Sequence, residues 1–145
     1  MKKAAAIVFI IVFLAAFYYL GWGRDAYYNH RDRTYWEELS SHISRSQVEE
    51  VILYSTYLSD TVSLEGEELN TFITKLCASE FYRSNWRLEG PTGPLISIKF
   101  KDGSKELNFQ YWGKGVYETA YDGAQFLITN EELDVILHRH GVYFK

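Results

Sequence analysis

The sequence has little cysteine and little proline, and each scarcity excludes a class of protein. Its 145 residues include 1 Cys, 2 Pro and 10 Gly. A single cysteine excludes an internal disulfide framework and any cysteine-rich zinc or iron–sulfur site. The low proline count, with 47% hydrophobic and 17% aromatic residues, excludes a disordered, collagen-like or low-complexity chain. The length suits one domain with a core of its own.

Positive charge and catalytic signatures are also scarce. The formal net charge of −4 argues against a nucleic-acid partner. No serine lies in a Gly-x-Ser-x-Gly elbow, and no glycine loop has the form that cradles phosphate. His138 and His140 lie two residues apart, about 200° around a helix, so they cannot share a metal ion while the helix continues. The sequence therefore predicts a protein that is not an enzyme and has no cofactor or metal site.

A long hydrophobic run lies at the N-terminus. Residues 4–20 read AAAIVFIIVFLAAFYYL, which is about 25 Å of helix and close to the lower limit for spanning a bilayer. The run exceeds the apolar region of a typical cleaved signal, and no Ala-x-Ala site follows it. Tyr18, Tyr19 and Trp22 lie where an aromatic belt would be. We predict a transmembrane signal-anchor over residues 1–23, with a cleaved signal peptide or a buried core helix as alternatives.

The charges around this run bear on its orientation. Lys2 and Lys3 favour a cytoplasmic N-terminus, whereas Arg24, Arg31 and Arg33 follow the run on its other side. Short lysine-bearing tails usually stay inside, so we expect the rest of the chain to be extracytoplasmic. Beyond the two lysines the chain has 13 basic and 19 acidic side chains. An anionic membrane surface would repel such a domain.

Residues 24–46 are expected to form a juxtamembrane helical stalk. Four apolar positions follow helical spacing: Tyr35, Trp36, Leu39 and Ile43. This spacing predicts a helix over residues 32–43. Its apolar stripe either packs on the domain that follows or makes a dimerising stalk.

Residues 47–145 are expected to form one small α+β domain. A β-branched and aromatic segment predicts a first strand within residues 47–59, after which residues 60–63 form a turn. Helical spacing predicts a helix over residues 65–79. Both prolines lie in residues 85–94, which predict an exposed loop. Alternating residues and glycine turns then predict a four-stranded meander over residues 95–100, 105–112, 116–121 and 124–128.

A capping box opens the last predicted helix. Thr129 and Glu132 have the Thr-x-x-Glu spacing, and Gly141 is placed to end the helix. An apolar tail over residues 142–144 follows. The sequence thus predicts a four- to five-stranded antiparallel sheet with helices on one face, preceded by one transmembrane helix.

Several reactive side chains have structural explanations. Cys77 lies on the apolar stripe of its predicted helix, where it suits a small core residue. Two acidic groups lie at helix starts, where capping and the helix dipole favour negative charge. These groups are Glu65, Glu67 and Glu68, and Glu131, Glu132 and Asp134.

One set of side chains predicts a binding surface. If alternate residues of the second meander strand face the helices, the remaining ones face the other side of the sheet. Side chains from the neighbouring strands are expected to join them. The predicted binding residues are Lys99, Asn108, Gln110, Trp112, Tyr117 and Tyr121. A face that mixes aromatic rings, amides and a lysine suits a protein, peptide or glycan partner, although an ordinary solvated sheet face has the same composition.

Residues 51–137 resemble small exported or membrane-anchored domains of unknown function, found mostly in Gram-positive bacteria. Three segments carry the resemblance: the strand before SLEGEELNTFITKL, the hairpin KDGSKELNF, and YDGAQFLITNEELDVIL. The resemblance implies the topology and an envelope location, and it carries over no catalytic residue. We expect a non-enzymatic, single-pass membrane protein of the regulator, inhibitor or immunity type that binds a protein or peptide. A cell-wall or glycan-binding domain is the alternative, and an unrecognised enzyme is a third.

Overall fold

The computed structural model describes residues 2–43, 47–55, 61–82 and 93–142. Most of the predicted loop at residues 85–94 and the end of the predicted tail lie outside these ranges. The chain divides into two compact units, residues 1–31 and residues 32–145.

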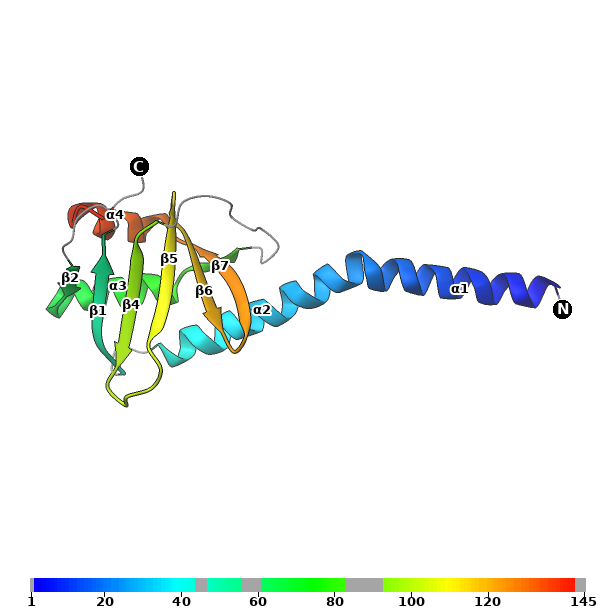
Figure 1. The fold of residues 1–145 in the computed structure, drawn as a ribbon, viewed down its shortest axis with the longest axis horizontal. Coiled ribbons are helices and arrows are strands. Elements are labelled where there is room, and N and C mark those ends of the chain that lie inside the picture. The colour runs from blue at the N-terminus through cyan, green and yellow to red at the C-terminus, as the bar shows by residue number, and fades with distance from the viewer. Residues whose placement is uncertain (1, 44–46, 56–60, 83–92, 143–145) are drawn as a thin grey trace. The chain divides into compact units, whose positions relative to one another are not determined.

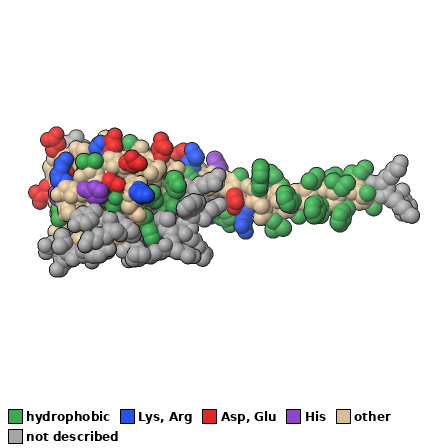
Figure 2. All heavy atoms as spheres, turned by 90° about the horizontal axis from the view of Figure 1, so that it is seen from above, with side chains coloured by type: hydrophobic (Ala, Val, Ile, Leu, Met, Phe, Trp, Pro, Cys, Tyr) green, Lys and Arg blue, Asp and Glu red, His purple; other side chains and the backbone are tan. Residues whose placement is uncertain are grey.

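The first unit consists of helix α1 (Lys2–Leu20) and the start of helix α2 (Trp22–His42). Its large hydrophobic side chains are exposed, from Ile7, 58% exposed, to Trp22, 83% exposed. Figure 2 shows such side chains along the length of α1. This helical stretch is long and apolar enough to cross a membrane, a property that anchors share with signal sequences. The predicted N-terminal apolar helix is thereby confirmed.

The second unit contains a seven-stranded antiparallel sheet and a layer of helices (Figure 1). The strands are β1 (Val48–Tyr54), β2 (Thr61–Leu64), β3 (Glu80–Tyr82), β4 (Leu95–Phe100), β5 (Leu107–Gly113), β6 (Val116–Tyr121) and β7 (Ala124–Thr129). The sheet has the order β2-β1-β4-β5-β6-β7-β3. The α+β class, the antiparallel sheet and the four-stranded meander are confirmed, but the predicted number of four to five strands is wrong.

The two unpredicted strands lie at the edges of the sheet. Strand β2 occupies residues expected to form a turn, and it pairs with β1 through Val51↔Leu64 and Tyr54↔Thr61. Strand β3 has only three residues and pairs with β7 through Phe81↔Ile128. Segments this short have almost no periodicity of their own, so only pairing with a distant strand makes them part of the sheet.

The core lies between the sheet and three helical segments: the second half of α2, α3 (Gly66–Cys77) and α4 (Glu131–Arg139). Trp36 and Leu39 of α2 are buried, and the Trp36 ring lies 6.5 Å from Phe109 and 6.3 Å from Phe126. The Trp36 indole N–H donates to the Ser79 carbonyl at 3.0 Å. The apolar stripe of the predicted helix at residues 32–43 therefore packs on the domain.

The two later helices are found close to their predicted positions. Glu65 precedes α3 and makes no side-chain capping bond. At α4 the capping side chain is Asn130, which accepts from the Glu132 N–H, instead of the predicted Thr129. Asn130 also donates to the Lys75 carbonyl at 2.7 Å, so the same side chain joins α4 to α3.

Candidate functional site

The meander divides into two arms at one end of the sheet. The ladder between β5 and β6 stops at the pair Phe109↔Thr119. Strand β5 stays paired with β4 as far as Leu107, and β6 stays paired with β7 as far as Tyr121. The two hairpins therefore separate beyond Phe109 and Thr119. A cleft of about 600 Å³, which we call the β5–β6 cleft, lies at this place.

The β5–β6 cleft combines apolar and polar walls from three parts of the second unit. The apolar lining is Leu39, Phe100, Leu107, Ala120 and Tyr121. The polar lining is His42, Ser104, Lys105, Glu106, Asn108 and Asp122, with the backbone of Gly123. Leu39, Phe100 and Leu107 are buried, whereas Asn108 and Ala120 are exposed. The cleft thus has an apolar base and an exposed polar rim.

Aromatic and hydrogen-bonding contacts fix the walls of the cleft. The His42 ring lies 5.8 Å from that of Phe100, and the Tyr121 ring meets Tyr35 edge-on at 6.2 Å. Thr119 Oγ1 donates to the Asn108 carbonyl at 2.9 Å, where the β5–β6 ladder ends. The walls are therefore preformed, because their side chains are held by contacts within the domain.

The β4–β5 turn beside the cleft is held by an aspartate. The Ser104 N–H donates to Asp102 Oδ1 at 2.8 Å. Hydrogen bonds from the Ser104 side chain and backbone lower the pKa of Asp102, so this carboxylate stays charged at neutral pH. Lys105 and Glu106 follow on the cleft rim. The rim therefore presents charges of both signs on an anchored turn.

Three of the predicted binding residues have structural partners on the sheet face that no described helix covers, here called the open face. Lys99 pairs with Glu50 at 3.0 Å, and their hydrogen bond lowers the Glu50 pKa and raises the Lys99 pKa. Gln110 Nε2 donates to the Pro94 carbonyl at 3.1 Å, which fixes the entry to β4. Trp112 Nε1 donates to Glu118 Oε2 at 2.9 Å.

Two predicted residues lie on the opposite face, which corrects the expected grouping. Tyr117 pairs with Tyr111 across the β5–β6 ladder, and cross-strand partners share a face. Tyr117 is therefore buried beneath the helices. Tyr121 packs from the same side, although it also lines the β5–β6 cleft. Of the six predicted residues, Asn108 and Tyr121 line the β5–β6 cleft together.

Parts of the open face are already buried, which favours the cleft as the candidate site. Ser97 and Leu127 face this side through their pairs with Asn108 and Glu118, yet they are 0% and 2% exposed. By contrast, Asn108 at the cleft is exposed. The β5–β6 cleft is therefore the part of the predicted surface where a hollow and exposed side chains coincide.

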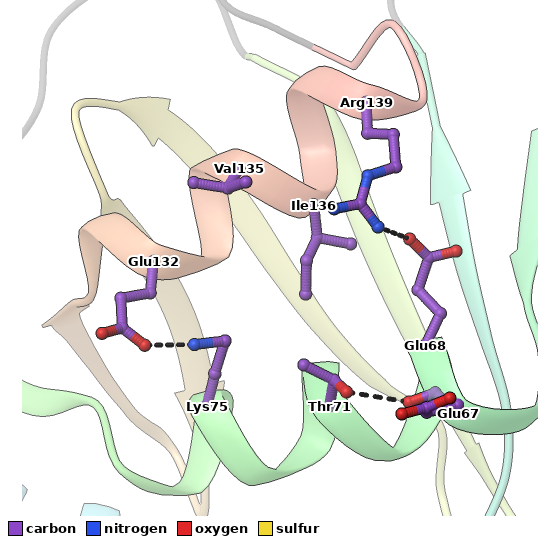
Figure 3. Close-up of a pocket in the computed structure, with 8 residues that line it drawn as sticks. All are labelled: Glu67, Glu68, Thr71, Lys75, Glu132, Val135, Ile136 and Arg139. Carbon is purple, nitrogen blue, oxygen red and sulfur yellow. Dashed lines mark hydrogen bonds and ion pairs between the residues drawn. The ribbon is translucent and has the colours of Figure 1, made fainter.

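A second hollow, of about 620 Å³, lies between α3 and α4 (Figure 3). Lys75 pairs there with Glu132, and Arg139 pairs with Glu68 at 3.0 Å. Figure 3 shows that both pairs bridge from one helix to the other. These charges join two helices of the fold, so we assign the groove a structural role.

A buried polar cluster beside α4 also has a structural role. Tyr117 Oη donates to Asp134 Oδ1 at 2.8 Å, and the Gly115 N–H donates to Asp134 Oδ2 at 2.9 Å. Tyr111 stacks on Tyr117, with ring centroids 5.1 Å apart. Burial, and then the bonds to Asp134, raise the pKa of both tyrosines. The cluster fastens the β5–β6 turn to α4.

The single cysteine forms a hydrogen bond with the residue that follows α2. Cys77 Sγ donates to the Ile43 carbonyl at 2.9 Å, and burial raises the pKa of the thiol. A thiol with a raised pKa is a poor nucleophile at neutral pH. Cys77 is half-buried and packs against the core, which agrees with the predicted role.

His42, Leu107 and Ala120 line the cleft but were not among the predicted binding residues. Leu107 was expected to face the helices, and its burial agrees with that expectation. The alternation of residues in β5 could not indicate that β5 and β6 separate next to Leu107, because this separation depends on the register of two hairpins. In the part of the chain that the structure describes, no group of three or more His, Cys, Asp or Glu is placed to hold a metal ion.

Comparison with known proteins identifies a similar fold but no family. No family model and no curated protein sequence matches the chain. A solved structure of similar fold is that of a putative lipoprotein from Clostridium perfringens, with a TM-score of 0.57 and 14% sequence identity. The match covers 76% of this chain and 93% of that one. The likeness agrees with the resemblance inferred from the sequence, and at this identity it describes the fold alone.

Proposed function

We propose that this chain is a single-pass, membrane-anchored envelope protein that binds an extended segment of a partner protein in its β5–β6 cleft. The observation that carries the proposal is the separation of β5 from β6 beside Phe109 and Thr119. Strand walls over an apolar base suit an extended peptide, which can add main-chain bonds while its side chains enter the hollow. The proposal includes no catalytic activity.

The membrane and envelope parts of the proposal have separate support. Helix α1 has the length and composition of an anchor, and Lys2 and Lys3 lie at its start, before the apolar run. The solved structure of similar fold is named as that of a putative lipoprotein. These features support our proposal that the second unit lies outside the cytoplasm. Protease treatment of intact cells should remove a C-terminal tag from the full-length, membrane-bound chain; a protected tag would refute this orientation.

The cleft is tested by a matched pair of substitutions. Ala120 and Gln125 are cross-strand partners, both exposed, but only Ala120 lines the cleft. Peptides selected from a random linear library on the full chain in lipid nanodiscs should bind Ala120→Arg at least roughly ten-fold more weakly, a loss of about 1.4 kcal/mol. They should bind Gln125→Arg like the wild type. Equal binding to both variants would remove the cleft from the proposal.

A glycan is the second candidate ligand, supported by a different part of the open face. The Trp112 indole donates to Glu118, and Gln125 donates to the other oxygen of that carboxylate. An indole beside polar side chains suits a sugar ring. Sedimentation with purified wall polymer should then be lost in Trp112→Ala and kept in Ala120→Arg. Absence of sedimentation for the wild type would exclude this candidate.

A further inference from the structure

The first turns of α2 carry a second distinctive surface, separate from the cleft. Arg24, Tyr27, Tyr28 and Arg31 follow the spacing i, i+3, i+4 and i+7, so they share one face of the helix. All four belong to the same compact unit as α1. Tyr27 is 64% exposed, and Arg24 is also exposed. We call these four residues the arginine–tyrosine face.

The side chains of this face are arranged around Tyr28. The Arg31 guanidinium lies 4.7 Å from the centroid of the Tyr28 ring, and Tyr27 meets the same ring edge-on at 5.6 Å. Helical side chains tilt toward the N-terminus of their helix. Arg31 follows this direction, because it lies over a residue three positions earlier. Its charge is therefore displaced toward α1.

The distance from α1 places this face at the level of lipid headgroups. A hydrocarbon core of about 30 Å takes roughly 20 helical residues, which run from Ala4 to Gly23. Arg24 then follows the apolar span directly, and the Arg31 backbone lies about 10 Å beyond Arg24 along the helix. Each headgroup layer is about 5–8 Å thick. Since Arg31 extends back toward α1, both guanidinium groups approach this layer.

We propose that the arginine–tyrosine face binds the phosphate groups of anionic phospholipids in the leaflet next to the second unit. Guanidinium groups form paired hydrogen bonds with phosphate, and tyrosine rings suit the membrane interface. Beyond residue 31 the chain has 11 basic and 18 acidic side chains, so charge complementarity with an anionic leaflet is localised here. The inference rests on the membrane anchor in the proposed function.

Arg33 supplies a matched control for the charge of Arg31. It lies two residues further on, about 200° around the helix, and belongs to the second unit. Its guanidinium lies over the Phe81 ring at 5.6 Å. Arg31→Gln and Arg33→Gln therefore remove the same charge at nearly the same level of α2, but only the first changes the arginine–tyrosine face.

The experiment titrates the full chain in neutral detergent with phosphatidylglycerol or phosphatidylcholine and follows bound lipid by native mass spectrometry. The wild type should bind phosphatidylglycerol about five-fold or more tightly than phosphatidylcholine, as expected for one arginine near anionic lipid. Arg31→Gln should reduce this preference, and Arg24→Gln with Arg31→Gln should abolish it. Arg33→Gln should retain it. Circular dichroism checks that each variant stays folded.

Two results would overturn the inference: no preference in the wild type, or an equal loss in Arg31→Gln and Arg33→Gln. Carbonate extraction of cell membranes tests the anchor separately. A chain that stays in the membrane but lacks lipid preference contradicts this inference alone. A chain released by carbonate contradicts the membrane-anchored function and the inference together.

Discussion

The two halves of α2 place the same residue type in opposite surroundings. Trp22, in the first unit, is 83% exposed, whereas Trp36, in the second, is 4% exposed and donates to the Ser79 carbonyl. Phenylalanine shows the same contrast, because Phe13 of α1 is 61% exposed and Phe109 of β5 is 0% exposed. The large apolar side chains described in the first unit are thus exposed, and such a surface suits lipid better than water.

The largest expected effect comes from replacing the buried tryptophan of this comparison. Trp36→Ala removes a ring that packs on Phe109 and Phe126 and an N–H that bonds to Ser79. We expect a loss of about 3–5 kcal/mol in the free energy of unfolding. Trp22→Ala should leave that free energy unchanged. Urea unfolding of the full chain in detergent, followed by near-UV circular dichroism, measures both; equal losses would contradict the division into two units.

The first unit can be altered without changing the second. Ile11→Arg places a charge near the middle of α1, where insertion into a membrane becomes less favourable by about 3 kcal/mol. We expect a smaller carbonate-resistant fraction and an unchanged unfolding midpoint for the second unit. Ile11→Leu is the control, and it should behave as the wild type. Normal membrane retention of the arginine variant would argue against α1 as the anchor.

Backbone packing in the second unit is tested at two glycines with the same positive φ of 71°. A Cβ at Gly115 would come within 2.8 Å of the Glu131 backbone nitrogen, whereas one at Gly103 would meet nothing within 4 Å. Gly103→Ala should cost about 1 kcal/mol for the left-handed conformation. Gly115→Ala should cost roughly 1–3 kcal/mol more, because α4 must shift. Equal midpoints in urea unfolding would contradict the close contact between the turn and α4.

The smallest expected effect is a pH dependence to which the buried tyrosines contribute. The pKa values of Tyr111 and Tyr117 are raised above the ordinary value of 10.0 by burial and by Asp134. Above about pH 10 the unfolded chain releases protons that the folded domain keeps, so the free energy of unfolding falls as pH rises. Replacing both tyrosines by phenylalanine should make this fall shallower between about pH 9 and pH 11.

The control for the pH dependence is Tyr82→Phe, because Tyr82 is 40% exposed and lies outside this cluster. At neutral pH Tyr117→Phe should also cost about 1 kcal/mol for the hydrogen bond to Asp134. Thermal melts across the pH range measure both effects. An alkaline fall that is unchanged by the double substitution would contradict the raised pKa values.

Much of the fold could be predicted because its signals are local. The apolar run at residues 4–20, the spacing around Phe72 and Leu76, and the alternation of Leu107, Phe109 and Tyr111 each indicate one element. The edge strands β2 and β3 could not be predicted, because four and three residues carry no period. Their strand character comes from pairing with β1 and β7.

The site was predicted in part, for a related reason. Alternation places Asn108, Gln110 and Trp112 on the same face of β5, as expected. The face of Tyr117 depends on the register across the β5–β6 turn, which contains an irregularity between Tyr111 and Gly113. A one-residue change of register moves every side chain of a strand to the other face. The alternation within β5 and the alternation within β6 therefore could not decide which side chains of the two strands share a face.

By itself the sequence determined the long helices and the four meander strands, and which segment is apolar enough for a membrane. Helix and strand periodicity depends on neighbouring residues, and suitability for a membrane depends on composition. Both can be read directly from the sequence. The tertiary structure alone decided that β5 and β6 separate beyond Phe109 and Thr119 and that Trp36 enters the core while Trp22 does not. Those outcomes depend on contacts between residues far apart in sequence, and local periodicity does not encode such contacts.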